Sequence, residues 1–273
     1  MCHHCVVESV KARMLSRRDL FRGAAAGAAV ASVGGLATSV PALAQGMSRA
    51  VDLTHELHEG FPTYFGEQQF FMEQKFAFAD DGFNLFELRV NEHTGTHMDA
   101  PLHFSADGQS VAEVPVENLV APLAVIDIRE RAEGDADAQV TPEDIQAWID
   151  ANGPLPERCC VAMSSGWDAK VSGDGFRNVG ADEKMHFPGF HVEAVQMLME
   201  QSTAIGIAVD TLSLDFGISP DFATHYAWLP TNRWGLEAVA NLSELPATGA
   251  TLVVGAPKHR GGTGGPSRVI ALV

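Results

Sequence analysis

The segment from residue 93 to residue 104 constrains the fold more than any other part of this 273-residue chain. Gly95 and Pro101 lie within it, and both residues disfavour an α-helix. Four polar side chains stand at odd positions, which share one face of an extended chain: His93, His97, Asp99 and His103. Fully extended, the run from His93 to Asp99 would cover about 20 Å, too far for both ends to reach one point. We therefore expect a bent chain, and Gly95 is the residue that bends most readily.

Imidazole nitrogens combined with a carboxylate oxygen are suitable ligands for a borderline divalent metal. The alternative is a set of hydrogen-bonded histidines at the end of a strand, which a single histidine would favour. Four possible ligands at alternate positions beside a glycine favour the metal centre.

The N-terminal segment is typical of an export signal rather than of a folded domain. Ser16–Phe21 contains a twin-arginine pattern, and the Ala/Gly run of residues 23–40 leads to Pro41–Ala44. A membrane anchor is the alternative, but the run is poor in Leu and Ile, and no Cys follows Ala44. We expect removal of residues 1–44, a periplasmic or secreted protein, and a single domain over residues 45–273.

Charge and cysteine usage exclude several classes of protein. The chain carries a net charge of −17, and residues 1–44 contain five Lys/Arg against two Asp/Glu, which leaves about −20 for the remainder. Such an acidic surface argues against nucleic acid and anionic membranes as partners. Cys2 and Cys5 precede the export signal, so we interpret their metal-like pattern as incidental. Cys159 and Cys160 are interpreted as buried thiols, since adjacent residues form a disulfide only with strain.

Short apolar or alternating runs predict strands, at residues 85–90, 123–128, 160–164, 204–209, 251–254 and 269–273. Two helices are predicted. One begins near Thr141, with Pro142 in its first turn and Ile145 and Trp148 on its inner face, and the other covers residues 190–201. Strands and helices do not alternate strictly, so we expect an α/β fold with a mixed, curved sheet and helices packed on it.

The pattern His-x-Gly-Thr-His-x-Asp-x-Pro-x-His, formed here by residues 93–103, resembles the signature of the cyclase family. That family includes kynurenine formamidases (arylformamidases) and isatin hydrolases. The resemblance extends from Asp52–His55 to the end of the chain, more loosely outside the signature. It implies a swivelling β/β/α-like domain in which the sheet is curved or partly closed into a β-barrel.

The resemblance also implies roles for individual residues. His93, His97 and Asp99 match the metal ligands of the family, and His103 matches a histidine that acts as a base or proton shuttle. Two more matches stand twelve residues apart and complete a second metal position in the formamidase branch: His225 and Glu237. Without the resemblance, His225 would be interpreted as a satisfied core histidine and Glu237 as an acid on a helix surface.

The implied activity is hydrolysis of a carbon–nitrogen bond in a cyclic amide or an aryl formamide. A divalent metal, Mn²⁺ or Zn²⁺ as one or two ions, would activate water and polarise the carbonyl. His103 or His225 would move the protons. The implied assembly is a homodimer or a higher homo-oligomer.

Substrate contacts are expected from aromatic rings, with Phe61 and Trp167 as first candidates. Thr96 is a third candidate at the substrate, and its hydroxyl would orient a ligand or a water, or cap the bend. The glycine-rich residues 261–265 lack the Gly-Lys-Ser/Thr ending of a phosphate loop. We interpret them as a tight loop between two strands, with a role at the pocket or at a subunit contact left open.

Two rival functions use the same residues. A non-haem iron oxidoreductase would use His97, Asp99 and His225 as a two-histidine, one-carboxylate triad, and Arg233 would hold an oxoacid. It leaves His93 and His103 without roles. A non-catalytic metal-binding protein would bind tightly without turnover, and it gives His103 no purpose.

Overall fold

The computed structural model describes residues 49–273. Among these, the chain clusters into a large unit, residues 49–71 with 90–273, and a small unit, Met72–Arg89. The expected export signal and the Cys2/Cys5 pair lie outside the described residues. No helix in the described part is both long and apolar enough to cross a membrane.

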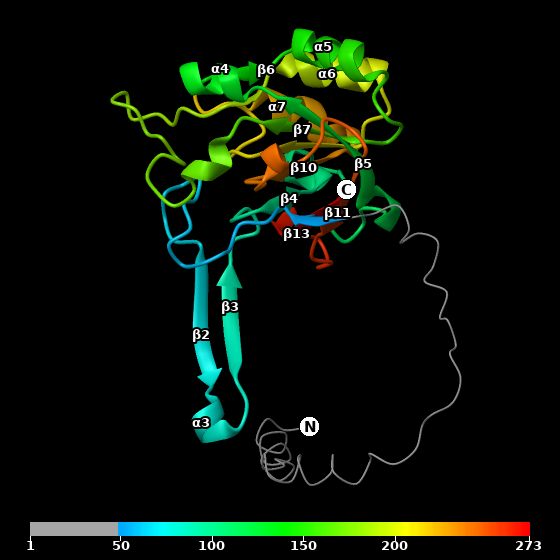
Figure 1. Ribbon diagram of the computed structural model, residues 1–273. Coiled ribbons are helices and arrows are strands. Elements are labelled where there is room, and N and C mark those ends of the chain that lie inside the picture. The colour runs from blue at the N-terminus through cyan, green and yellow to red at the C-terminus, as the bar shows by residue number, and fades with distance from the viewer. Residues whose placement is uncertain (1–48) are drawn as a thin grey trace, which may run out of the picture. The chain divides into compact units, whose positions relative to one another are not determined.

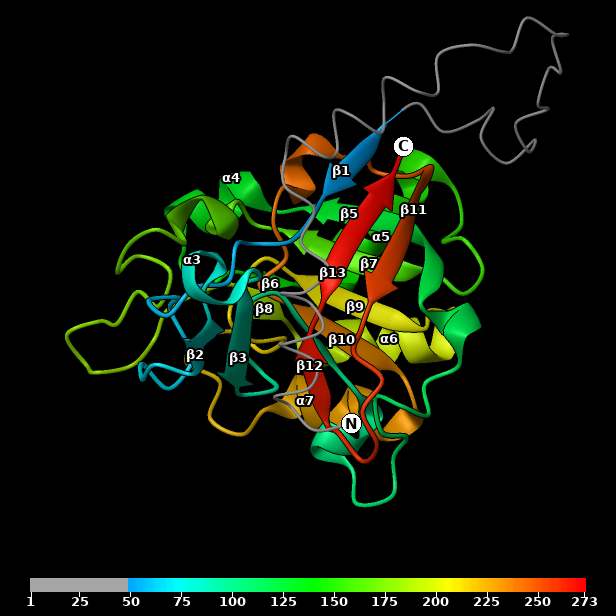
Figure 2. The same cartoon turned by 90° about the horizontal axis from the view of Figure 1, so that it is seen from below.

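The large unit is built on a nine-stranded mixed sheet with the order β1-β13-β11-β5-β7-β9-β10-β4-β12. Its strands are β1 (Ala50–Asp52), β4 (His97–Asp99), β5 (Val120–Asp127), β7 (Cys160–Ser164), β9 (Gly206–Val209), β10 (Trp234–Glu237), β11 (Ala250–Gly255), β12 (Gly264–Pro266) and β13 (Arg268–Leu272). The central strands β5, β7, β9 and β10 are parallel, and the flanking strands are antiparallel. Figure 2 shows β1, β13 and β11 side by side.

Three helices, α4 (Arg129–Gly134), α5 (Pro142–Asn152) and α6 (Val192–Gln201), lie on one side of this sheet (Figure 1). Helix α5 begins with the expected proline, and a capping box between Thr141 and Asp144 satisfies its first N–H groups. The remaining short elements of this unit are η2 (Pro101–Phe104), η3 (Val116–Asn118), β6 (Gln139–Val140), η4 (Trp167–Lys170), β8 (Gly189–Phe190), α7 (Ala223–Trp228), η5 (Leu229–Thr231) and η6 (Leu242–Glu244).

The sheet has a hydrophobic core on each face, because successive side chains of a strand point in opposite directions. On β5, Ala124 and Ile126 pack toward the helices, in one cluster with Trp148 and Leu198. Leu123 and Val125 belong to the other cluster, which also contains side chains of β1, β10, β11 and β13. A sheet curled around its own core is the mixed, curved sheet that we expected, and the predicted fold class is confirmed.

The expected strands and helices are all present, with ends shifted by a few residues. Cys159 and Cys160 are buried and unbridged on either side of the start of β7, as expected. Strand β4, which carries the central motif, and its neighbours β10 and β12 were not predicted. Each has only three or four residues, too few for a periodic pattern.

The small unit is a hairpin whose strands β2 (Phe70–Phe76) and β3 (Leu85–Val90) form a two-stranded sheet. A short helix, α3 (Phe78–Asp81), connects them, and the rings of Phe76 and Phe83 lie 4.8 Å apart. Alternation in β3 is typical of a strand with one buried face. Instead, all six residues of β3 are exposed in the described chain.

Candidate metal centre

Strand β4 sets two of the expected ligands on one face of the sheet. His97 and Asp99 are two residues apart, so their side chains share one face of the sheet. Met98, between them, is fully buried in the hydrophobic cluster on the opposite face. His97 Nδ1 bonds the carbonyl oxygen of Gly95 at 2.8 Å, and its Nε2 therefore faces Asp99 Oδ1 at 3.3 Å.

The chain bends before β4 at the residue expected to allow it. Gly95 has φ +71°, and a Cβ there would also lie 2.9 Å from Leu57 Cδ1. The bend turns His93 back toward the strand, so that its Nδ1 lies 2.8 Å from Asp99 Oδ1. Residues 93, 97 and 99 thus converge, and Asp99 lies between the two imidazoles.

Two distant elements complete the cluster. Strand β10 pairs with β4 so that Glu237 stands directly opposite His97, and their side chains approach to 3.3 Å. Helix α7 carries His225, whose Nε2 lies 3.1 Å from Glu237 Oε1 and 3.4 Å from Asp99 Oδ2. Glu237 is therefore a buried residue of a strand. The local sequence alone had indicated an acid on the surface of a helix.

His103 adjoins the cluster from η2, with its ring stacked on that of His93 at a centroid distance of 3.7 Å. Among residues 49–273, two groups have ligand atoms within 4.8 Å of one another, His93/Asp99/His103 and His97/Asp99/Glu237. His97 Nε2 and Asp99 Oδ2 are buried atoms without a hydrogen-bond partner. Orphaned polar atoms at one point, among imidazole and carboxylate groups, fit a bound divalent cation.

The electrostatics of the cluster depend on its burial. Burial acts to lower the pKa of His97, but the adjoining carboxylates of Asp99 and Glu237 outweigh it and raise the pKa to about 10. Burial likewise opposes charge on His225, yet Asp215, Asp99 and Glu237 hold its pKa well above the usual value. His103 differs, because burial lowers its pKa to about 4.

A cavity of about 360 Å³ lies over the cluster. Aromatic rings form much of its wall, together with the histidines: Tyr64, Phe65, Phe104 and Phe222. Phe104 and His225 rings are 4.5 Å apart, and Tyr64 and Phe222 rings are 6.0 Å apart. The cavity can therefore enclose a flat aromatic molecule beside the cluster.

The three residues expected at the substrate do not line this cavity. Phe61 and Trp167 are buried in an apolar cluster with Phe176, and neither lines this cavity. The Thr96 hydroxyl donates to Ala238 O at 2.5 Å and accepts from His55 N at 2.9 Å, so it ties backbone segments together. Phe61 instead borders the larger hollow described next, and a contact of these three residues with a substrate stays a prediction.

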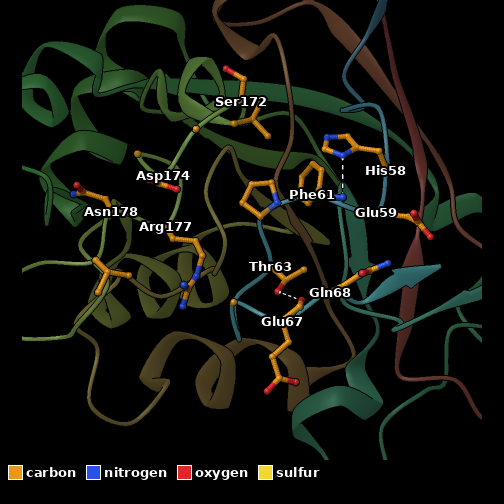
Figure 3. Close-up of a pocket in the computed structure, with 17 residues that line it drawn as sticks. His58, Glu59, Phe61, Thr63, Glu67, Gln68, Ser172, Asp174, Arg177 and Asn178 are labelled. Atoms are coloured by element: carbon orange, nitrogen blue, oxygen red, sulfur yellow. Dashed lines mark hydrogen bonds between the residues drawn. The ribbon is translucent and has the colours of Figure 1, made fainter.

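A second, larger hollow of about 1030 Å³ shares the Pro62–Thr63 segment with the first cavity (Figure 3). Its polar side chains come from two segments, with His58 on one and Asp174 and Arg177 on the other. In the described residues, no three ligating groups converge there. Among the described residues, the ligating groups that converge therefore lie at the smaller cavity.

The sequence reasoning missed the residues that support the ligands. Asp215 accepts a hydrogen bond from His225 Nδ1 at 2.6 Å, and Thr263 lies 2.9 Å from His93 Nε2. The sequence around these two residues does not contain the spacing of metal ligands found in residues 93–103. The only local signal was that Thr263 lies within a glycine-rich segment.

Comparison with known proteins agrees with this geometry. The family model described as "Putative cyclase" matches residues 51–216. Isatin hydrolase of Roseibium aggregatum is 34% identical over 67% of this chain and 73% of its own length. Kynurenine formamidase of Salinibacter ruber is 29% identical over 68% of this chain and 79% of its own length.

Among solved structures, isatin hydrolase A from Labrenzia aggregata, bound to benzyl benzoate, superposes with a TM-score of 0.79 at 37% identity. The match covers 85% of this chain and 96% of that structure. An isatin hydrolase bound to the product analogue thioisatinate gives a TM-score of 0.78 at 28% identity, over 95% of this chain and 99% of that one. The chain therefore belongs to the cyclase family, and the expectation of a cyclase-family hydrolase is confirmed.

Proposed function

We propose that the protein hydrolyses a carbon–nitrogen bond in a cyclic amide or an aryl formamide, at the cluster around Asp99. The observation that carries this proposal is the convergence of His93, His97 and Asp99 beneath a cavity walled by aromatic rings. Isatin is a cyclic aromatic amide and N-formylkynurenine is an aryl formamide, and enzymes for both are relatives of the chain.

His93, His97 and Asp99 would hold a divalent cation, and Asp99, His225 and Glu237 would hold a second. Such a cation supplies Lewis acidity, which polarises a carbonyl oxygen and lowers the pKa of water. The nitrogen and oxygen donors suit both Zn²⁺ and Mn²⁺. Export of an already folded protein would allow Mn²⁺ to be loaded in the cytoplasm. Elemental analysis of protein purified from the periplasm tests this, and full activity with zinc alone would exclude a need for manganese.

His103 would move the proton. Its lowered pKa keeps the imidazole neutral at pH 7, so it can accept a proton from the attacking water. The resulting imidazolium can donate that proton to the leaving nitrogen. Phe104 and Phe222 would hold the aromatic part of the substrate against the histidines and exclude bulk water.

The test is a hydrolysis screen of isatin, N-formylkynurenine and simple cyclic amides with protein of known metal content. His97→Ala should abolish turnover and release metal. The control is His186→Ala, which removes an imidazole that lies between Asp137 and Asp182 and does not line the cavity. Turnover of none of these amides by the metal-loaded protein would contradict the proposal.

The iron oxidoreductase is less well supported. Arg233, which would hold an oxoacid, donates instead to Ala204 O at 2.9 Å and lies over the ring of Trp228. It is not among the residues that line the cavity. Turnover that continues without oxygen would separate the hydrolase from this rival.

We also propose export and self-association. The twin-arginine pattern of Ser16–Phe21 supports export, and an Arg17→Lys, Arg18→Lys variant should remain in the cytoplasm of a bacterial host. Exposed apolar side chains of the hairpin, such as Phe78 and Leu88, support burial in a homodimer. Light scattering should show a dimer that Leu88→Glu weakens, and a wild-type monomer would contradict it.

A further inference from the structure

The glycine-rich residues 261–265 lie directly against the expected metal ligand His93. Strand β12 pairs with β4, and Gly264 stands opposite Asp99. A Cβ on Gly264 would lie 2.8 Å from His93 Cε1, and one on Gly262 would lie 2.7 Å from Glu92 Oε1. The absence of side chains therefore lets this segment close on the imidazole and on Glu92.

The close approach places a chain of hydrogen bonds behind His93. His93 Nε2 lies 2.9 Å from Thr263 Oγ1. The Thr263 hydroxyl and its backbone N–H both donate to Glu92 Oε2, the latter at 3.1 Å. The other carboxylate oxygen, Glu92 Oε1, accepts from His259 Nε2. Glu92 thus binds three donors at once.

The direction of these bonds decides which nitrogen of His93 carries a proton. The backbone N–H and the hydroxyl of Thr263 both reach Glu92 Oε2, and His259 Nε2 reaches Oε1, so both carboxylate oxygens act as hydrogen-bond acceptors. The Thr263 hydroxyl has one proton and gives it to Glu92. Its oxygen can then only accept from His93, so Nε2 carries hydrogen and Nδ1 keeps the lone pair.

This tautomer is the opposite of that in the neighbouring histidines. His97 and His225 bond through Nδ1 to Gly95 O and to Asp215, and both point Nε2 at the cluster. His93 points Nδ1 at Asp99 instead. Because His93 faces the cluster through Nδ1, its Nε2–H needs a hydrogen-bond acceptor on the far side of the ring. Thr263 Oγ1 occupies that position.

We propose that Thr263 and Glu92 are positioning residues that hold His93 as its Nε2–H tautomer and present Nδ1 to a divalent cation. The inference rests on the metal site of the proposed function, and it does not depend on which substrate is hydrolysed. It also explains the glycine-rich segment, whose lack of side chains brings the threonine within reach of the ring.

The first test measures Zn²⁺ affinity by competition with a chelator. Thr263→Val keeps the shape and removes the acceptor, so affinity should fall about 10- to 100-fold. Thr263→Ser restores the hydroxyl and should recover affinity to within a few-fold of wild type. Thr251→Val on β11 is a matched control and should change nothing. Glu92→Gln should weaken binding in the same direction as Thr263→Val.

The second test reads the tautomer by nitrogen-15 NMR of histidine-labelled, Zn²⁺-loaded protein. Wild type should show one ligand histidine protonated at Nε2, assigned by its loss in His93→Gln, beside ligand histidines protonated at Nδ1. In Thr263→Val the Nε2–H signal should broaden or shift. Unchanged Zn²⁺ affinity in Thr263→Val, or His93 protonated at Nδ1 in wild type, would overturn the inference. Failure of wild type to bind Zn²⁺ or Mn²⁺ would instead count against the metal site itself.

Discussion

Filling both metal positions of protein stripped of metal should release about two protons per chain at pH 7.5, one from each position. The count follows from the cluster. The raised pKa values of His97, about 10, and of His225 keep both imidazoles charged at this pH. Hydrogen bonds with the histidines outweigh burial and lower the pKa of Asp99 and Glu237, so neither carboxylate has a proton to lose. Ligating nitrogens must be neutral, and two imidazolium protons therefore leave.

The sign of the pH dependence follows directly. Below pH 10 the cation competes with the proton on His97, so affinity should rise with pH from 6 to 9. In each position one divalent cation replaces one imidazolium proton, so the buried cluster gains one positive charge per cation. The carboxylates of Asp99 and Glu237 lie within the cluster and offset this charge.

Titration calorimetry in two buffers of different ionisation enthalpy measures the released protons. His97→Gln has no imidazole proton to lose and should release about one. Saturable binding with no proton release would refute the reasoning, since it would mean that the imidazoles are neutral before the cation arrives.

Three further predictions concern single residues. His103→Ala should retain metal but lower kcat about 100-fold or more, measured with elemental analysis and steady-state kinetics; normal turnover would remove its acid–base role. Asp210→Ala should lower the free energy of unfolding by about 3 kcal/mol in urea melts, because the buried carboxylate accepts hydrogen bonds from Ser165 N, Ser165 Oγ and Gly166 N; a change below about 1 kcal/mol would mean that these donors find other acceptors. Burial raises the pKa of Cys159 to about 11, so alkylation of the native protein at pH 7.5 should be slow until denaturant is added, and rapid labelling would contradict the buried position.

Much of the sheet and its helix layer could be predicted because the signals are local. The apolar runs of β5, β7 and β9 and the inner faces of α5 and α6 are visible within ten residues of sequence. The bend at Gly95 was predictable for the same reason, since a glycine between two polar residues is itself the signal. The exposure of β3 was not predictable, because the alternation of its residues does not say what covers its apolar face.

The site divides in the same way. His93, His97 and Asp99 lie within seven residues, whereas Glu237 reaches His97 through a strand register between segments 140 residues apart. No local pattern around Glu237 contains that register, and family resemblance alone indicated its role. Phe61 and Trp167 were expected at the substrate because they are large aromatic residues near loops. Their burial with Phe176 depends on packing that the sequence does not display.

Asp99 also shows what a ligand search by residue type leaves out. Its cross-strand neighbours on β10 and β12 are both glycines, Gly235 and Gly264. A Cβ at Gly235 would lie 2.6 Å from Leu214 Cδ1, and one at Gly264 would lie 2.8 Å from His93 Cε1, so a side chain at Gly264 would displace that imidazole. Space beside the aspartate is therefore as necessary as the donors themselves. Because that space comes from strands far from the motif in the chain, glycine placement has to be read together with the ligand spacing before a cluster of this kind can be inferred.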